Sequence, residues 1–234
     1  MKILLTSATL QEIEPLLNWA KVYQKQDNLF FFEIGQAQIH ILISGIGMIA
    51  TSYNITNIIT QNNYDIALNF GLCGAYPNRG IQIGDVVNIT QEELGDTGAM
   101  DHENFLTVFD LGLIEPNEKP FINKTLKNPY ELETIEYYTE YDKVKSITVA
   151  STSGEEKQIA LRQKLFSAQV ENMEGAAFFY VMLMKKIKFF QIRAVSNIIE
   201  PRNKQKWQVK KAINRLNDSA IEIIKFLACS NLMI

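Results

Sequence analysis

Three polar residues in this sequence lie beside apolar segments that do not need them in order to fold. Glu174 begins an apolar, helix-forming segment, and Asn197 follows an apolar, strand-forming segment over residues 188–196. Glu12 comes shortly after a short apolar segment at the N-terminus. Open α/β sheets bind ligands beside the carboxyl ends of their strands. A carboxylate that begins a buried helix and an amide that ends a buried strand can therefore face one crevice, where we expect the active site.

The segment over residues 170–207 supplies two of these groups and the elements that position them. Residues 178–184 are apolar on almost every side, which predicts a helix buried on most of its faces. Residues 188–196 are too continuously apolar for a half-exposed edge strand and suit the middle of a sheet. The helix ends at Lys185 and Lys186, and the strand ends at Ser196 and Asn197.

Glu12 lies near the start of the first predicted helix, and its role has two interpretations. The run Thr9-Leu10-Gln11-Glu12 matches a capping box, in which the glutamate only satisfies a backbone N–H. Pro15 argues against this, because with Thr9 as the cap it falls beyond the first turn, where its ring and missing N–H disrupt a helix. We therefore expect the helix to start near Glu12, with the carboxylate in the preceding loop.

Apolar patterns predict the other elements of a single α/β domain over residues 1–234. Strands are expected over residues 2–6, 29–34, 38–44, 65–70, 85–89 and 146–150, and helices from 47 to about 61, 155–166 and 205–228. Residues 44–47 and 71–75 are glycine-containing turns, where the backbone can approach a ligand closely. Residues 91–129 are expected to be irregular, with His102 exposed on a loop, and His40 is interpreted as a strand surface residue.

Composition excludes several classes of function. The net charge is −3, the pI is near 5.6, and no basic run is long enough to bind nucleic acid. Two cysteines give no disulfide framework, and no apolar run approaches a membrane span. No signal peptide is recognisable, so we expect a cytoplasmic protein. No cofactor and no metal ion are expected.

The ordered motifs resemble the nucleoside phosphorylase and nucleosidase superfamily over nearly the whole chain. Met173-Glu174-Gly175-Ala176 matches the start of its ribose-binding helix, and Ser196-Asn197 matches the polar pair after its last sheet strand. The opening residues 1–17 resemble the methylthioadenosine/S-adenosylhomocysteine nucleosidases, with Glu12 at their water-activating carboxylate. Residues 196–202 with Trp207, together with residues 95–99 and 109–113, look most like the futalosine hydrolase branch, which releases hypoxanthine in a menaquinone pathway.

The resemblance implies a three-layer α/β fold, in which helices flank a central mixed, twisted sheet. It also implies roles in N-glycosidic cleavage, which by analogy with glycoside hydrolysis passes through an oxocarbenium-like sugar. Glu12 would activate water, Glu174 would hold the ribose hydroxyls, and Asn197 would stabilise the departing base. Other substrate-binding candidates are Met173, Gly74, Cys73 and Ser196. Residues 91–129 would form an oligomer contact and a cap over the substrate tail, in a homo-oligomer that is a dimer or larger.

Asn197 is where the sequence departs from adenine-cleaving relatives, which carry aspartate. An amide offers both a donor and an acceptor, matching a protonated N7 and O6 of hypoxanthine, whereas an ionised aspartate would face O6 with lone pairs. We therefore expect a 6-oxopurine base. Because asparagine is no general acid, N7 takes its proton from water or the base leaves only hydrogen-bonded. Arg202 is a candidate partner for a carboxylate on the substrate tail, with a solvated loop arginine as the alternative.

Phosphorylases of this superfamily hold phosphate with arginines near the first loop and the second glycine turn, because phosphate favours a bidentate cationic clamp. Here Asn69 and Phe70 precede that turn, and Arg79 is the nearest arginine in sequence. We therefore expect water as the nucleophile, and Cys73 as a packing residue rather than a nucleophile. The alternatives are another purine nucleosidase, such as one for methylthioadenosine or inosine, and a non-catalytic nucleoside-binding protein.

Overall fold

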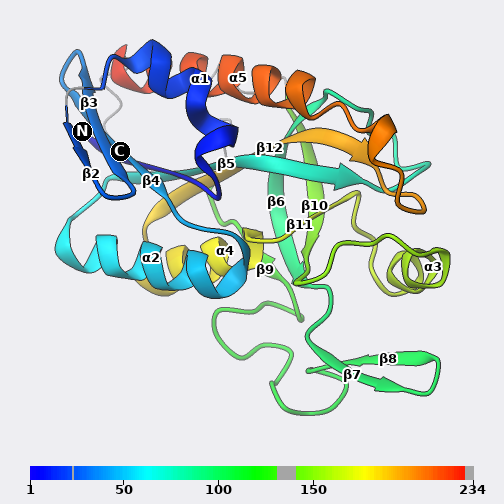
Figure 1. The fold of residues 1–234 in the computed structure, drawn as a ribbon. Coiled ribbons are helices and arrows are strands. Elements are labelled where there is room, and N and C mark those ends of the chain that lie inside the picture. The colour runs from blue at the N-terminus through cyan, green and yellow to red at the C-terminus, as the bar shows by residue number, and fades with distance from the viewer. Residues whose placement is uncertain (23, 131–140, 230–234) are drawn as a thin grey trace.

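The computed structural model describes residues 1–22, 24–130 and 141–229. Within them, ten strands form one mixed sheet, and β7 (Gly98–Asp101) and β8 (Asn104–Thr107) form a separate hairpin (Figure 1). The sheet order is β11-β10-β6-β12-β5-β1-β4-β3-β2, and β9 pairs with β6. These strands are β1 (Lys2–Ser7), β2 (Gln24–Gln26), β3 (Leu29–Ile34), β4 (Ala37–Ile43), β5 (Ile66–Ala75), β6 (Val86–Leu94), β9 (Leu126–Lys127), β10 (Asp142–Thr148), β11 (Val170–Asn172) and β12 (Lys188–Ile198).

The central strands are parallel, and their carboxyl ends lie at one edge. β1 pairs in parallel with β4 and β5, and β5 pairs in parallel with β12. β12 and β6 are antiparallel, which makes the sheet mixed. The continuous apolar runs of β5 and β12 are buried, as expected for strands covered on both faces.

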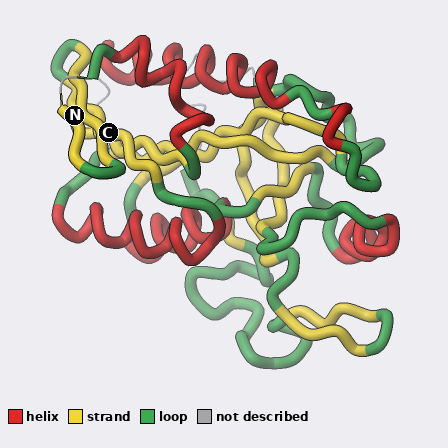
Figure 2. Tube along the Cα trace, viewed as in Figure 1, coloured by secondary structure: helices red, strands yellow, loops and turns green. Residues whose placement is uncertain are grey.

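Helices cover both faces of the sheet, which confirms the predicted three-layer arrangement (Figures 1 and 2). On one face, α1 (Leu10–Ala20) packs with α5 (Val209–Cys229), and on the other α2 (Gly47–Gln61) packs with α4 (Gly175–Lys185). A separate buried cluster lies under each helix pair. α3 (Glu156–Leu165) follows β10, and a short 3₁₀ helix, η2 (Lys204–Lys206), precedes α5. None of the helices that the structure describes combines the length and the hydropathy that a membrane span requires.

The prediction that α1 starts near Glu12 is wrong, because Thr9 is the N-cap and the capping box is formed. Pro15 lies inside the helix and is accommodated by Asn217 of α5. The Asn217 amide accepts from the Leu16 N–H at 2.9 Å and donates to the Glu12 carbonyl oxygen at 2.8 Å. It thereby replaces the backbone hydrogen bond between these two residues next to the proline.

The second predicted glycine turn is also wrong, because residues 71–75 continue β5 as a strand. β12 likewise continues two residues past Ser196, with a register shift between Val195 and Asn197 against β5. This irregularity changes the direction of the side chains at the end of β12. Residues 91–129 are less irregular than predicted, since they include the end of β6, the β7–β8 hairpin and β9.

Candidate active site

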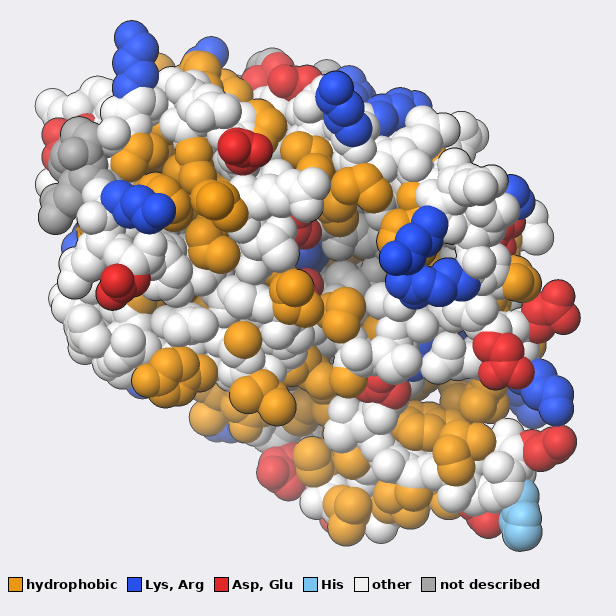
Figure 3. All heavy atoms as spheres, viewed as in Figure 1, with side chains coloured by type: hydrophobic (Ala, Val, Ile, Leu, Met, Phe, Trp, Pro, Cys, Tyr) orange, Lys and Arg blue, Asp and Glu red, His pale blue; other side chains and the backbone are white. Residues whose placement is uncertain are grey.

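One pocket of about 280 Å³ opens at the carboxyl ends of the central strands. In the space-filling view the molecule is hollowed at the middle of this face (Figure 3). All seven predicted site residues line this pocket, although they come from α1, β5, the start of α4 and β12. They are Glu12, Gly74, Cys73, Met173, Glu174, Ser196 and Asn197.

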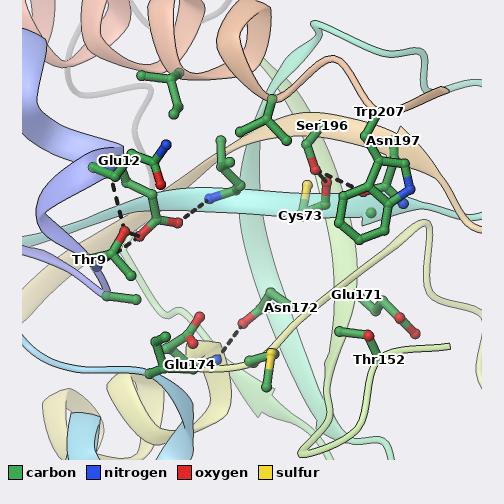
Figure 4. A pocket seen from close by; sticks show the side chains of 18 residues that line it. Thr9, Glu12, Cys73, Thr152, Glu171, Asn172, Glu174, Ser196, Asn197 and Trp207 are labelled. Atoms are coloured by element: carbon green, nitrogen blue, oxygen red, sulfur yellow. Dashed lines mark hydrogen bonds between the residues drawn. The ribbon is translucent and has the colours of Figure 1, made fainter. Parts of the chain in front are cut away.

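The Glu12 carboxylate both caps α1 and faces the pocket (Figure 4). Its Oε2 accepts from the Thr9 N–H at 2.9 Å, the Thr9 hydroxyl at 3.0 Å and the Ser7 hydroxyl at 3.3 Å. Its Oε1 accepts from one group, the Leu72 N–H, at 3.1 Å. The capping box thus holds the carboxylate in place through Oε2, and Oε1 keeps lone-pair capacity for a further partner.

Glu174 lies across the pocket from Glu12 and is 7% exposed (Figure 4). Its backbone N–H donates to Asn172 Oδ1 at 2.9 Å, and its Oε1 accepts from the Gly47 N–H at the start of α2 at 3.0 Å. Burial raises the pKa of the Glu174 carboxyl, and the Arg193 guanidinium and the Gly47 N–H oppose that rise. The first predicted glycine turn, residues 44–47, therefore contributes a donor to this carboxylate.

Arg193 of β12 is a site residue that the sequence analysis missed. It is fully buried, and Nη1 lies 3.7 Å from Glu174 Oε2, too long for a hydrogen bond. Nη1 and Nε have no hydrogen-bond partner among the residues that the structure describes. A side chain at Gly71 would collide with Nη1 and would lie 3.4 Å from Glu12 Oε1. The absence of a side chain at Gly71 therefore lets the guanidinium lie close against β5, near the Glu12 carboxylate.

Asn197 lies at the other end of the pocket beside Trp207, and Thr152 lines the same end next to Glu171 (Figure 4). The Ser196 hydroxyl donates to Asn197 Oδ1 at 2.8 Å, and Asn197 Nδ2 donates to the Ile198 carbonyl oxygen at 3.2 Å. Each end of the amide can make one more bond, so a donor and an acceptor remain for a ligand. The Arg202 guanidinium lies over the Trp207 ring at 5.2 Å from its centroid.

Cys73 is buried in the same pocket wall, and burial raises the pKa of its thiol to about 12. A thiol with this pKa is protonated at neutral pH and is no nucleophile. His40 bonds to Tyr64 on the sheet, and His102 is exposed at the β7–β8 turn. Neither histidine lines the pocket, nor does the exposed Arg79.

A buried polar network lies beneath the Glu174 end of the pocket. Glu92 accepts from Gln191 Nε2 at 2.6 Å, Asn172 Nδ2 at 2.7 Å and the Thr148 hydroxyl at 2.9 Å. Complete burial raises the pKa of Glu92 to about 7, although these bonds and Arg193 oppose the rise. Asn172 connects Glu92 to the start of α4, so this carboxylate supports the position of Glu174.

We expect Glu92→Gln to change how stability depends on pH. In the wild type Glu92 keeps its proton to about pH 7 when folded and loses it near 4.5 when unfolded. Its contribution to the free energy of unfolding is therefore complete below pH 4.5 and is lost as the pH rises through about 7. Relative to wild type, the variant gains on the order of 3 kcal/mol across this range. Denaturant titrations at several pH values measure the difference, exposed Glu103→Gln is the control, and parallel profiles for Glu92→Gln and wild type would contradict the expectation.

Comparisons with known proteins agree with this fold. A family model described as the phosphorylase superfamily matches residues 2–228. A futalosine hydrolase from Thermus thermophilus is 26% identical over 175 residues, which is 75% of this chain and 76% of that protein. A futalosine hydrolase from Acidothermus cellulolyticus is 24% identical over 184 residues, covering 77% of this chain and 72% of that protein.

Among solved structures, the chain is similar to a 5′-methylthioadenosine/S-adenosylhomocysteine nucleosidase from Neisseria meningitidis in complex with methylthio-immucillin-A. The TM-score is 0.79 at 20% sequence identity, and the alignment covers 96% of this chain and 98% of that one. At this identity the likeness shows the shared fold.

Proposed function

Since this chain belongs to the phosphorylase superfamily, we propose that it hydrolyses the N-glycosidic bond of futalosine and releases hypoxanthine and the dehypoxanthinyl sugar. The futalosine hydrolases from Thermus thermophilus and Acidothermus cellulolyticus support the substrate, since each is similar to this chain over about three quarters of its length. The charge of the pocket supports hydrolysis rather than phosphorolysis.

The pocket is acidic, and this observation is the main support for water rather than phosphate as the nucleophile. Glu12, Glu171 and Glu174 line it, and no lysine or arginine is among the described residues of its lining. Arg193 lies behind the lining and faces the Glu174 carboxylate. A phosphate dianion would meet like charges without a bidentate cationic clamp. A water molecule carries no negative charge, and it requires only a general base to become a nucleophile.

Glu12 is the general base for that water. A water molecule between the two side chains can donate to Glu12 Oε1 and accept from Arg193 Nη1, which has no hydrogen-bond partner among the described residues. Both groups are fixed, Glu12 by its capping bonds and Arg193 by burial, so the water is oriented before it reacts. As the water attacks the anomeric carbon, its proton passes to Glu12. The glycosidic C–N bond breaks, its electron pair leaves with the purine, and solvent water protonates the purine to give hypoxanthine.

Glu174 holds the ribose, because an ionised carboxylate is acceptor-only and can bind two hydroxyl groups. Its Oε1 uses one position for the Gly47 N–H and retains others toward the pocket. The negative charges of Glu12 and Glu174 also stabilise the positive charge that develops on the sugar in an oxocarbenium-like transition state. Met173 lies beside Glu174 in the lining and contacts the sugar.

Asn197 binds the base, with Cys73, Gly74 and Ser196 around it. The Ser196 hydroxyl orients the amide. Its free donor and acceptor positions match the N7 and O6 edge of hypoxanthine.

Asn197→Asp should shift the substrate preference from hypoxanthine nucleosides to adenine nucleosides. An ionised aspartate faces O6 with lone pairs only, so kcat/KM for futalosine falls by about 10- to 100-fold. The same carboxylate accepts from the amino group of adenine, so kcat/KM for methylthioadenosine rises. Steady-state assays on both substrates measure the change, with the exposed Asn63→Asp as the matched control. A variant that keeps the wild-type ratio of the two kcat/KM values would refute the role of Asn197 in base choice.

Chromatography of released bases tests the proposed function. The protein is incubated with futalosine, inosine, methylthioadenosine and S-adenosylhomocysteine, each with and without phosphate. Hypoxanthine release from futalosine at equal rates in both buffers supports the proposal. Turnover of methylthioadenosine without turnover of futalosine would show that futalosine is not the substrate. Dependence on phosphate would exclude hydrolysis. No turnover of any of the four compounds would favour a non-catalytic nucleoside-binding protein.

The proposed enzyme is a homo-oligomer, a dimer or larger, that acts in the cytoplasm in menaquinone biosynthesis. An exposed apolar surface over α2, α4 and residues 113–122 supports the oligomer, and hydrophobic side chains gather over α2 in Figure 3. Its members are Ile46, Ile49, Tyr53, Leu113, Ile122, Tyr180 and Met184. Light scattering of the purified protein tests the oligomer, and a monomeric mass would exclude it.

A further inference from the structure

The wall of the pocket around Thr152 is a loop held by charged side chains. The loop, residues 150–154, follows β10 and precedes α3, and Thr152 is its member in the pocket lining. Asp96, just after β6, accepts through Oδ2 from the Ala150 N–H at 2.7 Å and from the Ser151 N–H at 3.2 Å. One carboxylate therefore fixes the first two residues of the loop.

Glu171 fixes the next part of the loop from the opposite side. It is 3% exposed, and its Oε1 accepts from the Ser153 N–H at 2.6 Å. Its Oε2 accepts from the Ser153 hydroxyl at 2.7 Å and from the Tyr76 hydroxyl at 2.8 Å. These donors suit an ionised carboxylate, and charge-assisted bonds of this length are the strong ones.

Arg162 of α3 joins the two carboxylates and the loop. Its Nη1 donates to the Ser151 carbonyl oxygen at 2.9 Å and to the Ser153 hydroxyl at 2.8 Å. The same nitrogen lies 3.5 Å from Glu171 Oε2, and Nη2 lies 3.4 Å from Asp96 Oδ2. Its side chain is only 6% exposed and that of Glu171 3%, so this ion pair is shielded from water, whereas the Asp96 side chain is 21% exposed. Among the described residues, Arg162 is the cation between these two carboxylates.

Thr152 is left with its backbone groups free. Its N–H and C=O make no hydrogen bond to any described residue, whereas the N–H groups of Ala150, Ser151 and Ser153 are all bonded to side chains. Thr152 lies at the Asn197 end of the pocket, away from Glu12 (Figure 4). The bonded neighbours hold Thr152 against the pocket without using the groups that it presents there.

The strand β11 links this loop to the other end of the site. Adjacent residues of a strand point to opposite faces, so Glu171 reaches the loop while Asn172 reaches Glu174 and Glu92. The loop is nevertheless held by groups that touch neither Glu12 nor Arg193. A change at Arg162 should therefore move the wall and leave the chemical step in place.

We propose that Arg162 is a positioning residue that, together with Asp96 and Glu171, fixes the Thr152 wall against the purine base of the substrate. The inference rests on the proposed function, since it takes the Asn197 end of the pocket as the site of the base. Arg162 acts through the loop and touches no reacting atom. Its loss weakens binding of the base more than it slows cleavage.

Arg162→Met is the test variant. We expect KM for futalosine and the Kd for free hypoxanthine to rise by about tenfold or more, while kcat stays within about twofold. Arg162→Lys keeps the charge and one to two of the bonds, so it should restore part of the affinity. Exposed Lys164→Met on the same helix is the matched control and should leave KM, Kd and kcat unchanged.

Ser153→Ala covers the case in which Arg162→Met does not fold. It removes the hydroxyl that joins Arg162 to Glu171 and keeps all three charges, and we expect KM and Kd to rise about threefold. Wild-type KM and Kd in a folded variant would overturn the inference, whether or not the melting temperature falls. A fall in kcat at constant KM would also overturn it.

Titration calorimetry with hypoxanthine and adenine separates this inference from the proposed function. If the wild type binds a base but does not cleave futalosine, the proposed substrate is wrong, and the Kd values of the Arg162 and Ser153 variants still decide the role of the wall. If the wild type binds neither base, this end of the pocket is no base site and the inference fails.

Discussion

Glu12→Gln should lower kcat for futalosine hydrolysis by about 10²- to 10⁴-fold, the usual contribution of a general base. The amide has no basic lone pair that can take the proton of the attacking water. KM should stay near the wild-type value, because Glu174 and Asn197 still bind the substrate. The fold should also persist, since glutamine serves in a capping box as glutamate does.

Steady-state kinetics and thermal unfolding of the same preparation separate these effects. Glu14→Gln is the matched control, because it makes the same change on an exposed face of α1 and should keep the wild-type kcat. A Glu12→Gln protein that is folded and retains kcat within a few fold of wild type would remove Glu12 from the mechanism.

Arg193→Met has the second largest expected effect, and it acts on both activity and stability. Removing one partner of a buried ion pair costs about 3 to 5 kcal/mol, because the remaining charge is left uncompensated. Here Glu174 loses its cation and the attacking water loses its donor. We expect kcat/KM to fall by about 10²- to 10³-fold.

The pH profile distinguishes the role of Arg193 from simple destabilisation. Arg193 lowers the pKa of Glu174 and of Glu92, so its removal raises both. Because Glu174 must be ionised to hold the ribose, the acidic limb of kcat/KM should move to higher pH in Arg193→Met. Exposed Arg79→Met should leave the profile unchanged. A folded Arg193→Met protein with the wild-type profile would show that the guanidinium does not act on the site.

Local sequence patterns predicted the main strands and helices, and the family resemblance implied the three layers, but the local patterns failed where a distant residue changes local behaviour. Pro15 was a sound argument against a capping box at Thr9, and the structure keeps both. The reason is Asn217, about 200 positions further along, whose amide bridges the gap in the helix. No local pattern could reveal this contact. Glu12 therefore serves as both cap and pocket residue, where the sequence analysis treated these as alternatives.

The prediction of a second glycine turn, over residues 71–75, was wrong for a related reason. Glycines at positions 71 and 74 are typical of turns, yet here they lie in a buried strand. A side chain at Gly71 would collide with Arg193, and one at Gly74 would lie 3.3 Å from Asn197 Nδ2. The glycines make room for polar groups on β12, and only the pairing of the two strands shows this.

One of the two buried charged groups could have been found from the sequence. Arg193 interrupts the predicted strand over residues 188–196, whereas Glu92 lies beyond the predicted strand over residues 85–89. Charged side chains are almost never fully buried unless they are paired, so a charge in a predicted central strand implies a partner. The identity of the partners, Glu174 for Arg193 and Asn172 with Gln191 for Glu92, required the structure.

The fate of the oxygen atom of water tests the central claim most directly. Futalosine is incubated with the protein in phosphate-free, oxygen-18-labelled water, and the products are analysed by mass spectrometry. Hydrolysis should give one hypoxanthine for each futalosine consumed and one labelled oxygen at the anomeric carbon of the sugar product. An intact substrate, or a sugar formed only when phosphate is added and carrying phosphate at that carbon, would contradict it.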